Sequence, residues 1–283
     1  MLSYRHAFHA GNFADVLKHL ILIQLIEYLG KKDQPFCCID THAGAGDYAL
    51  NSAYALKNKE FAGGIAKLWQ RNDLPDAVAS YVQIIKQANY NGSLTRYPGS
   101  PLIIQQLLRN KDRLCLYELH STEVSLLKSA IGKDKRVKVF HADGLKNALS
   151  LLPPQERRGL ILIDPSYELK TDYDDIPKAL IAMHKRFTTG TYALWYPVVE
   201  RRRIQALERD LQASGIKNIQ LFELGIAGDS SEHGMTACGL IIVNPPWTLM
   251  AQMQAVLPWL VEVLGKDADT NKCFYRTQIL VKE

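Results

Sequence analysis

The residues best placed to do chemistry stand at the end of a short apolar run. The run from Gly159 to Ile163 has the length and composition of a buried parallel strand, and it stops at Asp164, Pro165, Ser166 and Tyr167. In an open α/β sheet, ligands bind beyond the carboxyl ends of the strands, so a carboxylate at this position predicts a binding or catalytic site. An Asp-Pro pair after a strand is also an ordinary turn. Other segments of the chain decide between these two interpretations.

Three further apolar runs end in the same way, at Asp40, Glu118 and Asp143, the last of which precedes Gly144. The carboxyl ends of parallel strands meet at one edge of a sheet, so we expect these acids to converge near Asp164. Glu118 stands where such folds place an acid for ribose hydroxyls. Turn chemistry can explain one or two such acids, but three successive strand ends favour a ligand.

A glycine-rich segment, Asp40-Thr-His-Ala-Gly-Ala-Gly46, follows the first of these strands. Glycine lets the backbone turn tightly and approach a nucleotide, so Gly44 and Gly46, together with His42, predict a nucleotide-binding loop. Read literally, the run from Gly44 to Ala49 also fits the dinucleotide fingerprint. The pattern by itself therefore does not separate a nicotinamide cofactor from S-adenosylmethionine.

The first eleven residues show neither helical nor strand periodicity, which predicts a loop or arm. This segment carries Tyr4, Arg5 and His6. Aromatic rings and cations together suit a nucleobase, so we expect these three residues to contact a nucleic-acid substrate.

A helix is expected from Phe13 to about Leu29, with Asn12 as its N-cap. On this helix Asp15, Lys18 and His19 lie three and four positions apart and form a polar patch in an apolar segment. The patch has two interpretations, a surface ion-pair cluster or a set of ligand contacts, and the local pattern does not choose between them.

The order of the predicted elements indicates a Rossmann-like α/β fold. Seven strands alternate with helices, and the last two are joined without a helix, which predicts a mainly parallel sheet with a terminal antiparallel hairpin. The segment from Phe274 to Val281 is a candidate for an additional edge strand. Strand patterns disappear between residues 47 and 111, so we predict a main domain of residues 1–46 and 112–283 and a helical insertion at 47–111. At the end of the insertion Ser100 is expected to cap a helix that begins at Pro101.

Composition narrows the class of protein without identifying a partner. The chain has 283 residues, 47% of them hydrophobic, and a formal net charge of +5, which permits a phosphate-bearing partner but does not require one. The five cysteines have no zinc-type spacing, so we expect no metal site and free thiols in a reducing cytoplasm. The N-terminus carries polar and aromatic residues where a signal peptide needs an apolar core, and the run from Leu20 to Leu29 is too short to span a membrane, so we expect a cytoplasmic monomer.

The order of these motifs resembles the class I S-adenosylmethionine-dependent methyltransferases, particularly the group that methylates the N6 of adenine. Five segments resemble the bacterial 23S ribosomal RNA adenine N6-methyltransferase J family more closely: 1–18, 40–46, 97–101, 157–173 and 190–198. The resemblance extends over nearly the whole chain, insertion included. It implies S-adenosylmethionine as cofactor and 23S ribosomal RNA as partner.

The resemblance also implies roles for single residues. The family contacts S-adenosylmethionine at positions that match His19, His42, Ser100, Glu118, Asp143, Gly144 and Asp164. Asp164 also matches the family's catalytic proton acceptor, and Tyr4 matches its substrate-contacting tyrosine. Lys18 is next to His19, and its charge independently suggests a contact with the carboxylate of the methionine moiety.

One position departs from the adenine-methyltransferase pattern, and a second segment also matches that pattern. The family has Asp-Pro-Pro-Tyr where this chain has Ser166 in the third place, which removes one ring restraint on the backbone. A second match, Asn244-Pro-Pro-Trp247, fits the general pattern better but follows the seventh strand, so we interpret it as a turn.

The predicted reaction is methyl transfer to an adenine amino group. Asp164 and the backbone carbonyl of Pro165 can accept hydrogen bonds from that group, and Tyr167 can stack on the base. The sequence leaves two alternatives open: a nicotinamide-dependent oxidoreductase, and a methyltransferase-like protein that binds RNA or cofactor without catalysis.

Overall fold

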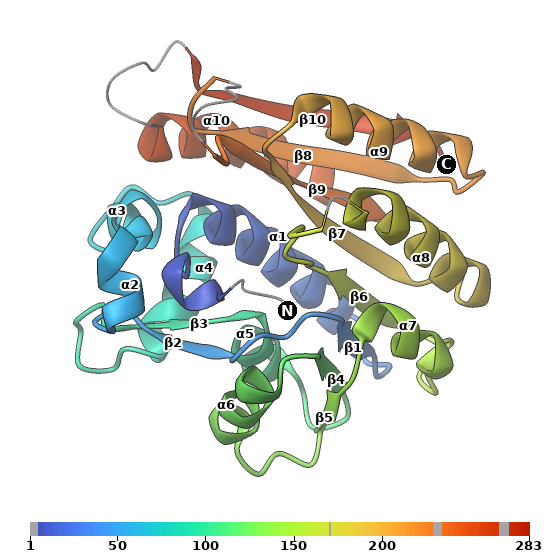
Figure 1. Cartoon of the computed structure of the whole chain (residues 1–283), viewed down its shortest axis with the longest axis horizontal. Coiled ribbons are helices and arrows are strands. Elements are labelled where there is room, and N and C mark those ends of the chain that lie inside the picture. The colour runs from blue at the N-terminus through green and yellow to red at the C-terminus, as the bar shows by residue number, and fades with distance from the viewer. Residues whose placement is uncertain (1–4, 170, 229–233, 266–271) are drawn as a thin grey trace.

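An eight-stranded mixed sheet forms the centre of the computed structural model, which describes residues 5–169, 171–228, 234–265 and 272–283 (Figure 1). The strands lie in the order β10 (Phe274–Val281), β8 (Ile219–Gly225), β9 (Ala237–Val243), β7 (Thr191–Val198), β6 (Gly159–Ile163), β1 (Cys37–Asp40), β4 (Arg113–Glu118) and β5 (Val137–His141). The five strands from β7 to β5 are parallel, whereas β9, β8 and β10 pair antiparallel. The seven predicted strands and the hairpin are confirmed, and the candidate edge strand is the eighth.

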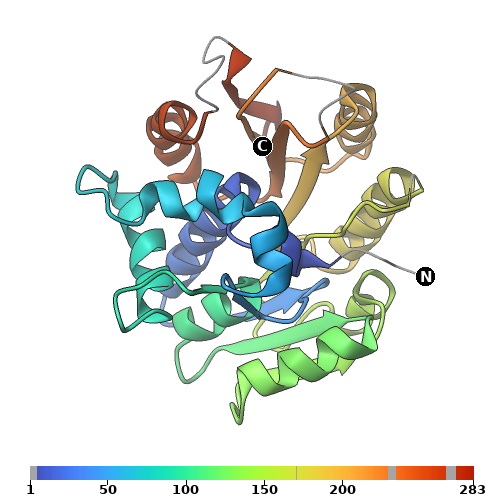
Figure 2. The same ribbon diagram turned by 60° about the vertical axis from the view of Figure 1, so that its left-hand side comes forward.

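Helices cover both faces of the sheet, as a doubly wound fold requires (Figure 2). One face packs against α1 (Phe13–Gly30), α5 (Ser100–Leu107), α6 (Ser121–Ile131) and α10 (Leu249–Leu264). The other face packs against α7 (Gly144–Asn147), the 3-10 turn η3 (Ala148–Leu151), α8 (Asp172–Arg186) and α9 (Arg201–Ala213). The strands β1, β6 and β9 are buried along their whole length because both faces are covered.

The helix α1 is buried on all sides over most of its length, which is unusual for a helix of a globular protein. Its N-terminus begins as predicted, since the side chain of Asn12 accepts hydrogen bonds from the backbone N–H groups of Ala14 and Asp15, both at 3.0 Å. The sheet covers one side of α1 and the segment 47–98 covers the other. A helix in this position can therefore carry polar side chains into the interior.

The segment predicted as a helical insertion contains β2 (Asp47–Ala49), α2 (Ala53–Asn58), the 3-10 turn η2 (Glu60–Gly63), α3 (Ile65–Leu68), α4 (Asp76–Gln87) and β3 (Arg96–Pro98). The prediction that it lacks strands is wrong, because β2 and β3 pair antiparallel, with Tyr48 opposite Tyr97. Three-residue strands are too short to leave a periodic pattern. The turn η2 and the helix α3 are separated at Gly64, where a side chain would collide with the backbone of Gly11. The division into two domains stays a prediction.

Two expectations from composition concern free thiols and membrane-spanning helices. All five cysteines are free thiols, four of them buried and Cys273 half-buried. Within the described ranges, no helix is both long and apolar enough to cross a bilayer.

Candidate functional site

Asp164 follows β6 directly and lies at the edge where the five parallel strands end. The pairing of Ile163 with Leu194 places Trp195 of β7 beside it. Tyr167 adopts a left-handed backbone conformation with φ of 53°, and its hydroxyl donates to the carbonyl of Trp195 at 2.9 Å. Its ring also packs against Tyr173, with ring centroids 4.6 Å apart. These contacts fix the Asp164–Tyr167 corner against β7, although Ser166 lacks the ring restraint that a proline would supply.

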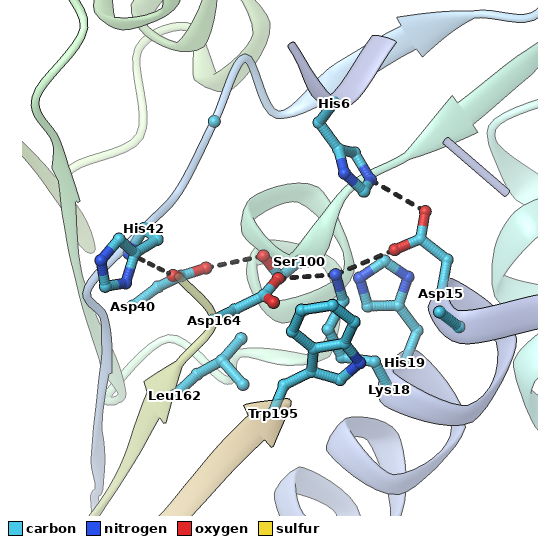
Figure 3. A network of polar contacts seen from close by, with 12 residues as sticks. His6, Asp15, Lys18, His19, Asp40, His42, Ser100, Leu162, Asp164 and Trp195 are labelled. Carbon is cyan, nitrogen blue, oxygen red and sulfur yellow. Dashed lines mark hydrogen bonds and ion pairs between the residues drawn. The ribbon is translucent and has the colours of Figure 1, made fainter. Parts of the chain in front are cut away.

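A chain of polar side-chain contacts leads from the N-terminal segment to Asp164 (Figure 3). His6 contacts Asp15 at 2.9 Å, Asp15 contacts Lys18 at 2.9 Å, and Lys18 contacts Asp164 at 2.6 Å. The Lys18 ammonium also lies 5.7 Å from the ring centre of Trp195. No role was predicted for Trp195. Its position near the carboxyl end of the strand that adjoins β6 was the only feature of the sequence that could have indicated one.

Burial shows that this chain is not a surface ion-pair cluster. The side chains of Asp15 and Lys18 are 1% and 5% exposed. Burial disfavours the charge on Lys18, but the carboxylates of Asp15 and Asp164 outweigh it and raise the lysine pKa well above its usual value. Burial likewise acts to raise the pKa of Asp15, and the neighbouring His6 and Lys18 more than reverse it, so that pKa is lowered. The lysine and its aspartate are therefore ionised together in the interior.

His19 lies next to Lys18 and presents an unpaired nitrogen. Its Nδ1 is 2.7 Å from the hydroxyl of Tyr97, which in turn lies 3.0 Å from the hydroxyl of Tyr81. Its buried Nε2 has no hydrogen-bond partner among the described residues. Burial lowers the pKa of His19 to about 3, so the ring is neutral at physiological pH. When Nδ1 accepts from Tyr97, Nε2 carries the proton and can donate to an anionic ligand.

Asp40 lies at the start of the glycine loop and is completely buried. Its carboxylate accepts hydrogen bonds from the Ser100 hydroxyl at 2.7 Å and from the backbone N–H of His42 at 3.1 Å. Burial raises the pKa of Asp40 to about 7 despite these two hydrogen bonds. The prediction that Ser100 caps a helix is wrong: Gly99 is the N-cap residue, and the hydroxyl donates to Asp40. That contact spans sixty positions in the sequence, so no local pattern could indicate it.

The glycine loop is connected to Glu118 at the end of β4. The backbone N–H groups of Gly44 and His120 donate to the two carboxylate oxygens of Glu118 at 2.8 and 2.7 Å. Gly44 and Gly46 have φ of 61° and 79°, and a side chain at Gly44 would meet the Tyr48 hydroxyl. Both positions therefore require glycine, as predicted.

The loop after β5 packs tightly against the glycine loop. A side chain at Gly144 would approach the backbone oxygen of Thr41 to 2.2 Å, so the two loops touch backbone to backbone. Asp143 caps α7 by accepting from the N–H of Lys146. His42 faces several carboxylates at this edge, yet burial is the largest influence and lowers its pKa. The acids at the four strand ends therefore converge as the sequence predicted.

The predicted substrate residues at the N-terminus have different outcomes. Tyr4 lies outside the described residues. Arg5 donates to the hydroxyl of Tyr54 at 2.8 Å, whereas His6 points toward Asp15. Their contacts with substrate stay predictions, as does the contact of Lys18 with a cofactor carboxylate.

The second match to the adenine-methyltransferase pattern lies away from this site. β9 runs antiparallel to β7, so Asn244 stands at the opposite edge of the sheet. Its side-chain amide donates to the carbonyls of Thr188 and Gly190, both at 2.8 Å, and Trp247 is 81% exposed. The interpretation of this segment as a turn agrees with that placement.

The arrangement at the Asp164 edge fits a nucleoside-containing cofactor better than a metal ion. It offers loop backbone that approaches closely, a carboxylate at the position of ribose contacts, and a buried histidine nitrogen without a partner. No group of three or more potential metal ligands occurs among the residues that the structure describes.

Comparisons with known proteins agree with this description. Residues 33–277 match the family model described as "Ribosomal RNA large subunit methyltransferase D, RlmJ". The chain is 52% identical over 260 residues to ribosomal RNA large subunit methyltransferase J of Escherichia coli, covering 92% of this chain and 93% of that protein. It is 49% identical over 265 residues to the Haemophilus influenzae protein of the same name, covering 93% and 94%. A crystal structure of a Legionella pneumophila protein superposes with a TM-score of 0.88 at 40% identity, covering 96% of this chain and 98% of that one.

Proposed function

The chain belongs to the ribosomal RNA large subunit methyltransferase J family, and on that premise we propose that it methylates the exocyclic N6 of an adenine in 23S ribosomal RNA. It is an S-adenosylmethionine-dependent enzyme, as its family membership shows. The nicotinamide-dependent alternative finds no support in these relatives. The choice of adenine N6 as acceptor and the roles of single residues are our proposal.

The observation that carries the proposal is the placement of Asp164. Its carboxylate lies at the sheet edge beside the glycine loop and is 14% exposed, so one side remains open to a substrate. The N6 amine is a weak nucleophile because its lone pair is delocalised into the ring. Hydrogen bonds to Asp164 and to the carbonyl of Pro165 localise that lone pair and stabilise the positive charge that develops on nitrogen. After transfer the nitrogen is strongly acidic, and Asp164 accepts its proton.

Lys18 is a positioning residue in this scheme. It holds one carboxylate oxygen of Asp164 at 2.6 Å, which leaves the other oxygen to face the adenine. Asp15 and His6 extend the charge chain and fix the ammonium in turn. Correct orientation of the acceptor is the largest expected contribution, since well-oriented pairs gain on the order of 7 to 11 kcal/mol.

The residues of the glycine loop and its neighbours would hold S-adenosylmethionine. Glu118 is placed for the ribose hydroxyls, the unpaired Nε2 of His19 for the methionine carboxylate, and Gly44 for close backbone approach. When bound, the cofactor supplies an electrophilic sulfonium methyl group. The set of proposed contacts is completed by Lys18, Asp40, His42, Gly46, Ser100, Asp143, Gly144 and Asp164. Asp40 and Ser100 act by bonding to each other beneath the loop.

The substrate must present its adenine unpaired or flipped out of a helix, because the amino group of a paired base cannot reach Asp164. Tyr167 is our candidate for stacking on that base, and Tyr4, Arg5 and His6 are candidates for further contacts. Flipping costs a few kcal/mol, and least for a base that is already unpaired. Protein-free ribosomal RNA is therefore the preferred acceptor.

The remaining expectations follow from this chemistry. A sulfonium methyl group needs no Lewis acid, so we propose that no metal takes part. We also propose that the chain acts as a monomer in the cytoplasm, where ribosomal RNA is assembled, and that residues 47–111 form a subdomain inserted into the methyltransferase domain 1–46 and 112–283.

The test measures methyl transfer to protein-free 23S ribosomal RNA from a strain that lacks the gene, followed by mapping of N6-methyladenine. Asp164→Asn and Asp164→Ala should each lose transfer, because the amide cannot take the proton and alanine offers no oxygen. Trp247→Ala, at the opposite sheet edge, is the matched control and should retain transfer. Unchanged activity in Asp164→Ala would refute the assigned mechanism, and methylation of another base would refute the assigned acceptor.

A further inference from the structure

Two aromatic rings and two cations lie next to one another on the surface of the N-terminal segment and α2. The rings of Phe8 and Tyr54 meet edge to face with centroids 5.1 Å apart. The Arg5 guanidinium lies 5.4 Å from the centre of the Tyr54 ring, and the Lys57 ammonium lies 5.7 Å from that of Phe8. We call these four residues the Tyr54 stack.

The Tyr54 stack is exposed rather than part of the core. Tyr54 is 43% exposed and its neighbour Leu56 is 46% exposed, while Ala55 on the inner side of α2 is buried. Lys57 is exposed and makes no ion pair with any residue in the described part of the chain. Rings and cations gathered on an exposed face are the features with which proteins bind single-stranded nucleic acid.

The Tyr54 stack is structurally connected to the catalytic corner. Arg5 and Phe8 are close in sequence to His6, where the chain of polar contacts to Asp164 begins. The turn η1 (His6–Phe8), which contains Phe8, packs on α2. Glu60 joins the two segments, since its carboxylate bonds to His9 at 2.8 Å and to the Asn12 side chain at 3.0 Å. The position of the stack relative to Asp164 is therefore set by partly buried side-chain contacts.

We propose that the Tyr54 stack binds an unpaired nucleotide that flanks the target adenine in ribosomal RNA. The base packs on Tyr54, and Lys57 and Arg5 contact the adjoining phosphates. This inference rests on the proposed function and names the part of the RNA footprint that the inserted segment contributes. Stacking tolerates any base, so the contact increases affinity and fixes the position of the RNA on the protein, but it does not select a sequence.

The experiment uses the full-length protein and measures binding to a 23S ribosomal RNA transcript and to a single-stranded oligouridine. Tyr54→Leu keeps an apolar side chain but removes the ring, and it should weaken binding roughly 5- to 100-fold. Lys57→Ala should reduce the slope of log affinity against log salt concentration by about 0.7, which corresponds to one phosphate contact on a single strand. In methylation assays the loss should appear in the KM for RNA.

Matched controls come from the same inserted segment. Tyr90→Leu removes an almost fully exposed tyrosine, and Lys86→Ala removes an exposed lysine that lies 5.9 Å from the ring centre of Trp69. Both should bind oligouridine as the wild type does. Thermal unfolding of each variant verifies that the fold is retained.

Three outcomes would overturn the inference. They are wild-type affinity in both Tyr54→Leu and Lys57→Ala, equal losses in the controls, and a loss confined to the 23S transcript while oligouridine is bound as by the wild type. Because binding is measured without methyl transfer, these outcomes are distinct from a failure of the proposed function, which would leave wild-type protein unable to form N6-methyladenine.

Discussion

Replacing Asp40 by asparagine should raise the free energy of unfolding at neutral pH. In acid, where the carboxyl is protonated in both the folded and the unfolded state, the substitution should hardly change it. Asp40 is completely buried, and burial raises its pKa from 3.8 to about 7. In the unfolded chain this carboxyl has its ordinary pKa. Below that value both states are protonated, and the group makes no pH-dependent contribution. As the pH rises toward 7 the unfolded chain loses the proton first, so ionisation favours unfolding.

The magnitude follows from the difference between the two pKa values. A difference of about three corresponds to about 4 kcal/mol of stability, present below the ordinary pKa and lost by the time the pH passes the folded value. Above that pH both states are ionised and the loss is constant. Asparagine cannot ionise, yet its amide can still accept from the His42 N–H and donate to the Ser100 hydroxyl oxygen. The variant should therefore escape most of this loss.

The assay is urea unfolding of wild type and Asp40→Asn between about pH 4 and about pH 8. The difference in unfolding free energy should grow with pH by about 4 kcal/mol in favour of asparagine and level off above pH 7. Asp210→Asn, on the exposed side of α9, is the control for removing an ordinary carboxylate. A constant difference, or one that favours the wild type at high pH, would refute the reasoning. Calorimetry should show weaker S-adenosylmethionine binding by the stabler variant, because asparagine reverses the direction of the hydrogen bond to Ser100 and removes the carboxylate beside the glycine loop.

Three further substitutions test the catalytic corner. Lys18→Met removes the cation shared by Asp15 and Asp164. It should lower the free energy of unfolding in urea by about 3–5 kcal/mol and abolish methyl transfer. A loss of stability below about 1 kcal/mol would show that the ion pairs are dispensable. Tyr167→Phe loses the hydrogen bond to the Trp195 carbonyl and should lower stability by about 1 kcal/mol and reduce kcat by loosening the loop. Adding Ser166→Pro to that variant should restore part of kcat, and no recovery would mean that loop rigidity does not limit the reaction.

Local sequence signals were enough to predict the strands of the main sheet, the helix from Phe13 and the edge where the acids gather. Apolar runs, a capping asparagine and paired glycines are local signals, and each acts through the conformation of a few neighbouring residues. The strands before Asp40 and Asp164 and the capped helix from Phe13 could therefore be predicted. The position of Asn244 after the seventh strand was likewise enough to set it apart from the catalytic corner.

Tertiary structure decided which polar groups meet. Lys18 and Asp164 are 146 positions apart, and Ser100 and Asp40 are 60 apart, so no spacing in the sequence relates them. The sequence left Lys18 equally compatible with a solvated helix face, and only the covering of α1 on both sides excludes water from it. Ion pairing and pKa depend on burial and on distances in space. Both are set by how segments that are distant in the sequence pack together, so no single segment determines them.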